Sequence, residues 1–145
     1  MALYLPDVNV LIHALRKDSL EHKGCRAWLR VTAAAGDAIG LCEQVEAALL
    51  RIPTLPRLQL IPMRETLGFW KGDLWTYPGT RRLSAGDRHR EIFSTFFTHL
   101  CLAGNDVNDA WLVALAIEHR ATLVSTAEGF ARFPGLAWIN PADPR

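Results

Sequence analysis

Three carboxylates in this 145-residue sequence could act together, because each lies among apolar residues beside an expected strand or at the start of an expected helix. They are Asp7, Glu46 and Asp109. An ionised carboxylate is costly to bury unless it is paired or bound to a cation, and carboxylates that point to one spot raise one another's pKa. A divalent cation would relieve both costs, and oxygen-only ligands favour Mg²⁺ or Mn²⁺ over zinc. These three residues therefore predict a metal site.

The elements expected around these residues bring them to one edge of a sheet. Short apolar runs at 2–6, 38–42 and 121–125 are typical of buried strands in a parallel sheet, and 43–52 and 109–119 have the patterns of helices. Strands that alternate with helices predict a parallel sheet with helices on both faces. Sites in such sheets lie beyond the carboxyl ends of the strands. We therefore expect the three acids to meet at that edge.

The rest of the chain continues the same alternation. Further helices and strands are expected at 8–15, 19–35 (capped by Ser19), 65–75 (interrupted by Gly72), 81–83, 88–102, 128–133 and 136–139, with a proline-containing loop at 53–62. The expected fold class is α/β: a three-layer α/β/α sandwich with a central parallel sheet, formed by a single domain over residues 1–145.

Each acid taken alone has a simpler interpretation. Asp7 and Asp109 lie at helix starts, where aspartate commonly acts as a cap. Glu46 can complement the positive end of a helix or face solvent. A shared site is favoured because three acids lie at the same end of three elements. Glu43 and Asp106, each one helical turn earlier, are interpreted as a helix-start acid and a loop or cap residue.

The composition is that of an ordinary globular protein, with 50% apolar residues, 21% charged residues and a formal net charge of +1. This small net charge does not by itself predict a nucleic-acid binder. Cys25, Cys42 and Cys101 form no CxxC pair, so we expect three core thiols rather than disulfides or a thiolate zinc site. There is no signal-peptide pattern and no apolar run of the roughly 18 residues that a membrane span needs, which predicts a cytoplasmic protein without membrane contact.

Four segments carry a resemblance to a known family. Residues 7–11 (DVNVL) resemble the "DxNxL" start of PIN domains in VapC toxins, and Glu46 with Arg51 resembles their "TELxxxR" helix. Residues 109–116 (DAWLVALA) are similar to "DAxLAALA", and residues 130–136 read FARFPGL, as in the tail of related members. The order and spacing match over nearly the whole chain. A receiver domain or a haloacid-dehalogenase-type phosphatase fits less well, because neither of their acidic motifs is present.

The resemblance implies an α/β/α fold and an Mg²⁺- or Mn²⁺-dependent endoribonuclease that acts as the toxin of a type II toxin–antitoxin system. It also implies a homodimer, an RNA substrate and a VapB-like antitoxin that binds beside or into the active site. Asp7, Glu46 and Asp109 match the first three acids of the family, as metal ligands and catalytic residues. Asp109 is the candidate to orient or deprotonate the attacking water. Asn9 is expected to donate a hydrogen bond that holds the carboxylate of Asp7 in place.

At the fourth acidic position, this chain departs from the pattern of the family. The family places an aspartate after the penultimate strand, as in "TxDxxF", whereas this chain has Ala127 there. Either the fourth acid is missing, or Glu128, Ser125 or Thr126 substitutes for it through a hydroxyl or water contact. The loss puts a second metal in doubt. It also leaves open an alternative function, a catalytically weak or inactive PIN-fold binding module.

Residues that could hold RNA are less well marked. Basic side chains could neutralise phosphates, or could simply be solvated: Arg16, Lys17, Lys23, Arg81, Arg82, Arg88 and Arg90. Aromatic side chains between 69 and 77 could stack on bases, but we expect them to pack in a dimer or against the antitoxin: Phe69, Trp70, Trp75 and Tyr77.

Overall fold

A computed structural model describes residues 1–143 of the chain, and these residues build one parallel sheet covered by helices. The five strands are hydrogen-bonded in the order β3-β2-β1-β4-β5, and every neighbouring pair is parallel. Their bounds are β1 Leu3–Pro6, β2 Ala38–Leu41, β3 Thr80–Arg82, β4 Thr122–Val124 and β5 Trp138–Ile139. The expected parallel sheet is therefore confirmed, including the short strand near residue 81.

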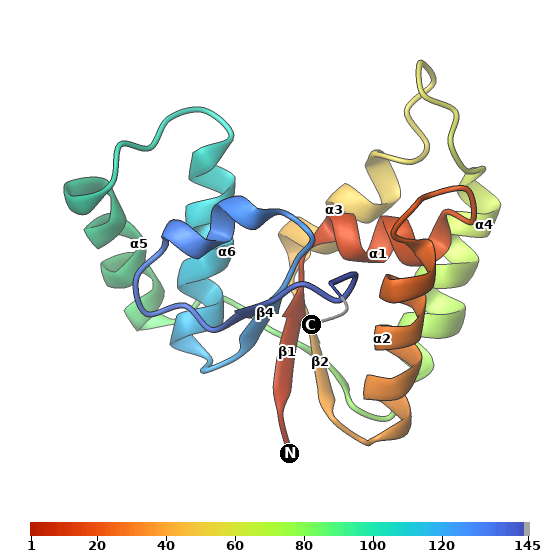
Figure 1. Cartoon of the computed structure of the whole chain (residues 1–145), viewed down its shortest axis with the longest axis horizontal. Coiled ribbons are helices and arrows are strands. Elements are labelled where there is room, and N and C mark those ends of the chain that lie inside the picture. Colours follow the sequence, from red (N-terminus) through yellow and green to blue (C-terminus); the bar gives the residue numbers. More distant parts are fainter. Residues whose placement is uncertain (144–145) are drawn as a thin grey trace.

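Helices lie on both faces of this sheet, as Figure 1 shows: α5 and α6 on one side, and α1, α2 and α4 on the other. Their bounds are α1 Val8–Leu15, α2 His22–Ala34, α3 Glu43–Arg51, α4 Met63–Leu67, α5 Asp87–His99 and α6 Asp106–Glu118. A π-helix (Gly68–Asp73) and a 3₁₀ turn (Leu74–Thr76) continue α4, and a second 3₁₀ turn spans Glu128–Arg132. The predicted three-layer α/β/α architecture is confirmed.

The order of the strands reverses between β1 and β4, and this reversal creates a natural binding place. From β1 the chain builds outward through β2 and β3, and then returns to add β4 and β5 on the other side of β1. Connections leave β1 and β4 toward opposite faces, which opens a crevice at the carboxyl ends of these two strands. The backbone N–H of Asp7 donates to the carbonyl of Val124 at 2.8 Å, so the two strand ends meet.

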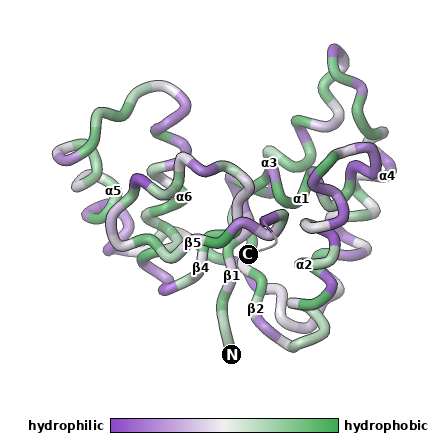
Figure 2. The backbone as a smooth tube through the Cα atoms, in the orientation of Figure 1, coloured by the Kyte–Doolittle hydropathy of each residue, from purple (hydrophilic) through white to green (hydrophobic). Residues whose placement is uncertain are grey.

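The core is formed by the strands together with the most apolar helix, α6. Residues 112–116 of α6 are buried one after another, and β2 is buried along its whole length. In Figure 2 hydrophobic and hydrophilic colours alternate along the helices that surround the sheet, as expected of helices with one buried side. The prediction that the helix after residue 108 is buried is confirmed. Within residues 1–143 no helix is long and apolar enough to cross a membrane.

Several local expectations need correction. The second helix begins at His22 rather than at residue 19, because Ser19 forms a turn in which its Oγ accepts the N–H of Glu21 at 3.2 Å instead of capping the helix. Gly72 does not interrupt the segment after residue 63, which stays helical to Thr76 by widening into a π-helix. Of the three cysteines expected in the core, Cys101 is exposed, because it follows the end of α5.

Candidate active site

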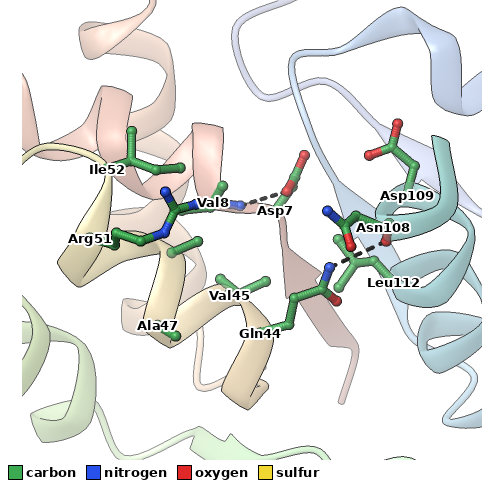
Figure 3. A pocket seen from close by; sticks show the side chains of 11 residues that line it. Asp7, Val8, Gln44, Val45, Ala47, Arg51, Ile52, Asn108, Asp109 and Leu112 are labelled. Carbon is green, nitrogen blue, oxygen red and sulfur yellow. Dashed lines mark hydrogen bonds between the residues drawn. The ribbon is translucent and has the colours of Figure 1, made fainter. Parts of the chain in front are cut away.

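A cavity of about 410 Å³ opens where α1, α3 and α6 approach one another at the carboxyl edge of the sheet. Figure 3 shows Asp7 and Asp109 facing each other across it, from the start of α1 and the first turn of α6. Polar side chains of α3 and α6 complete its lining, namely Gln44, Arg51 and Asn108. The structure thus brings two of the three predicted acids to one place.

Asp7 is held in a single position by hydrogen bonds to both carboxylate oxygens. It is the N-cap of α1, and its Oδ1 accepts the N–H of Val8 at 2.7 Å. Its Oδ2 accepts from Asn9 Nδ2 and from Ser125 Oγ, each at 3.1 Å. Because Asp7 caps a helix and also belongs to this network, its carboxylate is aimed by the end of β1 and the start of α1 together.

Ser125, Asn9 and Thr126 form the support behind Asp7. Ser125 is fully buried directly after β4, and its Oγ lies within 3.3 Å of Asn9 Nδ2. The Oδ1 of Asn9 accepts the backbone N–H of Thr126 at 3.4 Å, so the contact of Thr126 with this network uses its backbone. These bonds join the ends of β1 and β4 across the strand-order reversal.

Asp109 is the more open of the two acids. Its side chain is 45% exposed, and its Oδ2 lies 3.9 Å from Nη2 of Arg132. That arginine is bound more closely by Asp106, whose Oδ1 lies 3.0 Å from the same nitrogen. The structure starts α6 at Asp106, one turn earlier than predicted, so Asp106 is a helix residue whose Oδ2 also accepts the N–H of Ala103. The oxygens of Asp109 are therefore largely free to face the cavity.

Burial works against ionisation at both acids. Loss of contact with water raises the pKa of Asp7, and the nearby Asp109 charge adds to the rise, while the hydrogen bonds from Val8 and Ser125 oppose it. Burial also raises the pKa of Asp109, against the opposing effect of Arg132. Two carboxyl groups whose charge is disfavoured, side by side in a crevice, are the electrostatic pattern of a functional site.

Glu46 lies elsewhere, which changes the expected three-carboxylate site. Gln44 and Ala48 face the cavity, and Glu46 is about 200° further round the helix than Gln44, because each residue of an α-helix advances by roughly 100°. Its Oε2 instead accepts the indole N–H groups of Trp70 at 2.6 Å and Trp75 at 2.8 Å. The structure therefore places Glu46 on the opposite side of α3, as an anchor for the segment that follows α4.

The donors that remain suit a magnesium-type ion. Within residues 1–143, no three His, Cys, Asp or Glu side chains gather in a way that could hold a metal. Mg²⁺, however, keeps several waters and is commonly bound through one or two carboxylates together with substrate phosphates. Asp7 and Asp109 supply that number of carboxylates, and their raised pKa values fit a place built for a cation. The cavity lining also includes Gln44, whose buried Oε1 has no hydrogen-bond partner among the described residues.

The other acids considered from the sequence lie outside this cavity. Glu43 is exposed and forms an ion pair with Arg82. Glu128 lines a separate hollow with Trp138 and Asn140, so it does not take the fourth acidic position. Ala127 at that position is exposed, and its N–H donates to Ser125 Oγ at 3.1 Å.

Two residues near the acids were not singled out as site residues from the sequence. Arg132 belongs to the segment FARFPGL, whose similarity to the family was noted, but no signal marked its side chain as a partner of Asp106 and Asp109. Gln44 reaches across from α3, and its Nε2 donates to the carbonyl of Asn108 at 3.4 Å. A glutamine in an amphipathic helix carries no pattern from which this bridge could be predicted.

A comparison of the sequence with known protein families is consistent with this fold. Residues 4–136 match the family described as PIN domain. Because this match covers most of the chain, the protein belongs to the PIN domain family.

Named relatives make the comparison more specific. The chain is 37% identical over 138 residues to "Ribonuclease VapC43" of Mycobacterium tuberculosis, which covers 94% of each protein. Among solved structures, it is similar to VapBC2 from Rickettsia felis bound to a DNA fragment from their promoter, with a TM-score of 0.70, 20% identity and coverage of 95% of this chain and 98% of that chain. It is also similar to a toxin–antitoxin complex from Klebsiella pneumoniae, with a TM-score of 0.59, 16% identity and coverage of 97% and 98%. At these identities the structures support the fold alone.

Proposed function

We propose that this protein is a metal-dependent endoribonuclease toxin that hydrolyses RNA phosphodiester bonds in the cavity between Asp7 and Asp109. The observation that carries the proposal is that the carboxyl groups of Asp7 and Asp109 line one cavity at the reversal of strand order. The ribonuclease name of a relative with 37% identity over nearly the full length supports the same activity.

Asp7 and Asp109 would hold one Mg²⁺ or Mn²⁺ ion between them, without Glu46. When bound, such an ion polarises a phosphoryl oxygen and lowers the pKa of a coordinated water. Asp7 contributes a fixed carboxylate, because Val8, Asn9 and Ser125 restrain both of its oxygens. A ligand fixed in this way loses little freedom on binding, which favours a defined geometry.

We assign to Asp109 the role of orienting the attacking water and accepting its proton. Its carboxylate accepts no hydrogen bond within the described residues, and its nearest cation, at 3.9 Å, is Arg132. Free lone pairs facing a cavity can orient a water and accept its proton. In the metal-free protein, burial raises the pKa of Asp109 and Arg132 opposes that rise.

The decisive experiment measures both cleavage of a structured RNA and Mn²⁺ binding by calorimetry. We expect Asp7→Asn and Asp109→Asn each to reduce cleavage by about 100-fold or more, because a metal ligand is at least as important as the groups that support it. Both variants should also lose most of their Mn²⁺ affinity. Glu46→Gln is the matched control: it too removes one carboxylate, and we expect Mn²⁺ affinity close to that of the wild type.

Each opposite result has a definite meaning. Undiminished cleavage by Asp7→Asn would rule out the proposed site. A loss of Mn²⁺ affinity in Glu46→Gln would restore Glu46 as a ligand and require α3 to rotate. Binding of Mn²⁺ without cleavage of any RNA would favour the inactive binding module, an alternative to which the two-carboxylate site and Ala127 lend support.

The proposal includes protein partners. A solved toxin–antitoxin complex of the same fold supports a VapB-like antitoxin as the partner. A homodimer is proposed as well, and exposed apolar side chains of Met63, Leu67 and Trp75 offer a surface for one of these contacts. Light scattering of the purified chain, alone and after co-expression with the product of a neighbouring small gene, tests both partners.

A further inference from the structure

We propose that Arg51 binds a phosphate of the RNA strand next to the bond that is cleaved. This inference rests on the proposed function and adds a substrate-binding residue to it. A site with two carboxylates repels an RNA backbone, so a nuclease needs fixed positive charge beside the acids as well as a bound cation. Arg51 is placed to supply that charge.

Arg51 lines the same cavity as Asp7 and Asp109. It is carried by the last turn of α3, and Figure 3 shows its side chain directed toward the start of α1, where Val8 and Asp7 lie. The guanidinium group and the two carboxylates therefore border one space. An arginine there can donate two parallel hydrogen bonds to a phosphate, which lysine cannot do.

The guanidinium group of Arg51 is available for this contact. It makes no hydrogen bond or ion pair with any residue among 1–143, although the side chain is exposed beside two acids. Arg132, which is also close to Asp109, differs in this respect, because its Nη2 is bound by Asp106 at 3.0 Å. Of these two arginines, only Arg51 has its full hydrogen-bonding capacity free for a substrate.

Helix direction supports an anionic ligand at this place. The helices α1 and α6 begin where the cavity opens, so the positive ends of their dipoles lie toward it, whereas α3 borders the cavity from Gln44 to Arg51. Arg51 lies at the negative end of α3, which explains why a basic residue is stable there but not why it lines the cavity. A purely structural role and a substrate role can be separated by experiment.

The test compares Arg51→Gln with Arg120→Gln. Arg120 is an exposed arginine between α6 and β4, at the other edge of the sheet, so the control removes the same charge far from the cavity. Binding of a short fluorescein-labelled single-stranded RNA is followed by anisotropy in EDTA at several salt concentrations. An Asp109→Asn background prevents cleavage during this measurement. Cleavage of the same RNA is then measured with Mn²⁺ in the otherwise wild-type chain.

We expect Arg51→Gln to weaken RNA binding about 10-fold, as for the loss of a hydrogen-bonded charge pair. The slope of log affinity against log salt should fall by about 0.7, the value for one phosphate contact on a single strand. Arg51→Lys should restore the slope but only part of the affinity, whereas Arg120→Gln should leave both near their starting values. With Asp109 intact, Mn²⁺ affinity should not fall in Arg51→Gln, Arg51→Lys or Arg120→Gln.

Equal RNA affinity and equal salt slope in Arg51→Gln and Arg120→Gln would overturn the inference, and a lower thermal midpoint in Arg51→Gln alone would then identify a structural role. That failure differs from failure of the proposed function. If the wild type neither binds nor cleaves RNA, the nuclease proposal and the role of Arg51 are both rejected. If the wild type cleaves and Asp7→Asn does not, a normal Arg51→Gln rejects only the role of Arg51.

Discussion

Asp7, which we propose as a metal ligand, shows how a residue placed for binding can lower the stability of the protein that contains it. Its carboxylate makes three hydrogen bonds, yet burial and the charge of Asp109 still raise its pKa above the usual value of 3.8. Folding therefore favours the protonated form of this group. A group of this kind lowers stability at neutral pH unless a cation compensates, which is the cost expected of a preformed metal site.

The first prediction concerns Asp7→Asn in the absence of divalent metal. Because the folded-state pKa of Asp7 lies above its unfolded value, wild-type stability falls as pH rises through the interval between the two values. Asparagine cannot ionise and is an equally good helix cap, so the variant escapes this loss. The thermal midpoint of Asp7→Asn minus that of the wild type should therefore be more positive at about pH 7 than at about pH 4.

The control for this prediction is Glu128→Gln, which removes an exposed acid outside the cavity. Its midpoint relative to the wild type should change little over the same pH range. Added Mn²⁺ at neutral pH should raise the midpoint of the wild type, since a ligand stabilises the state that binds it, but should not raise that of Asp7→Asn. A difference that shrinks with rising pH would show that the pKa of Asp7 is not raised.

The sequence predicted that Asp7 and Asp109 lie together, but it did not predict the position of Glu46, for a physical reason. Val45 and Leu49 identify the buried side of α3, and both flanks of that side border the core. The pattern does not say which flank faces Asp7. That choice depends on what packs against each flank: Gln44 reaches α6 on one side, and the two tryptophans bind Glu46 on the other.

At the scale of elements, one carboxylate adds hydrogen bonds between the end of α6 and the start of α5. Glu118, the last residue of α6, accepts the backbone N–H groups of Gly86, Arg88 and His89 at 2.8, 3.1 and 3.0 Å. These N–H groups belong to the start of α5, where the helix itself leaves donors without partners. A Cβ on Gly86 would lie 2.6 Å from Glu118 Oε2, so a larger residue there would displace the end of the Glu118 side chain.

The second prediction concerns Glu118→Gln. Burial opposes ionisation of Glu118, but the three backbone hydrogen bonds and the nearby His119 together lower its pKa. The stability that the carboxylate provides is therefore present above the unfolded pKa of 4.5 and is lost as pH falls through the lower folded value. At neutral pH we expect Glu118→Gln to be less stable by on the order of 1 kcal/mol, the usual value of a helix cap.

Urea unfolding of Glu118→Gln at several pH values checks this prediction. The difference from the wild type should shrink as the solution is made more acidic than pH 4.5. Glu91→Gln is the matched control, because Glu91 is an exposed glutamate of α5. A loss in Glu118→Gln that is independent of pH would mean that shape, and not charge, holds the two helices together.

The elements themselves were largely predictable, whereas their details were not. Apolar runs identified β1, β2, β4 and β5, because a buried parallel strand has few polar side chains, whereas the edge strand β3 carries two exposed arginines. The π-helix at Gly68–Asp73 was not predicted, since its wider turn departs from the spacing of an α-helix. Gly79 illustrates another limit: a Cβ there would collide with the carbonyl oxygen of Asp37, a contact that depends on the pairing of β2 with β3.

At the scale of the whole molecule, the topology explains why the site lies where it does. Asp7 follows β1, Ser125 follows β4, and Asp109 starts the helix that leads into β4, so three segments distant in sequence meet at one reversal of strand order. The net charge of +1 conceals this arrangement, because two acids and a free arginine are concentrated in one cavity. Position in the fold, rather than composition, predicts the function.

The last prediction tests the packing of the whole molecule through its thiols. Cys25 and Cys42 are buried, and burial raises the pKa of Cys25 to about 11, so its reactive thiolate is scarce at neutral pH. Cys101 is exposed after α5. We expect a thiol reagent to modify Cys101 alone in the native protein, and all three cysteines once guanidinium has unfolded it. Cys101→Ser should abolish the native reaction. Rapid modification of either remaining thiol in that variant would contradict the packing of α2 or α3 against the core.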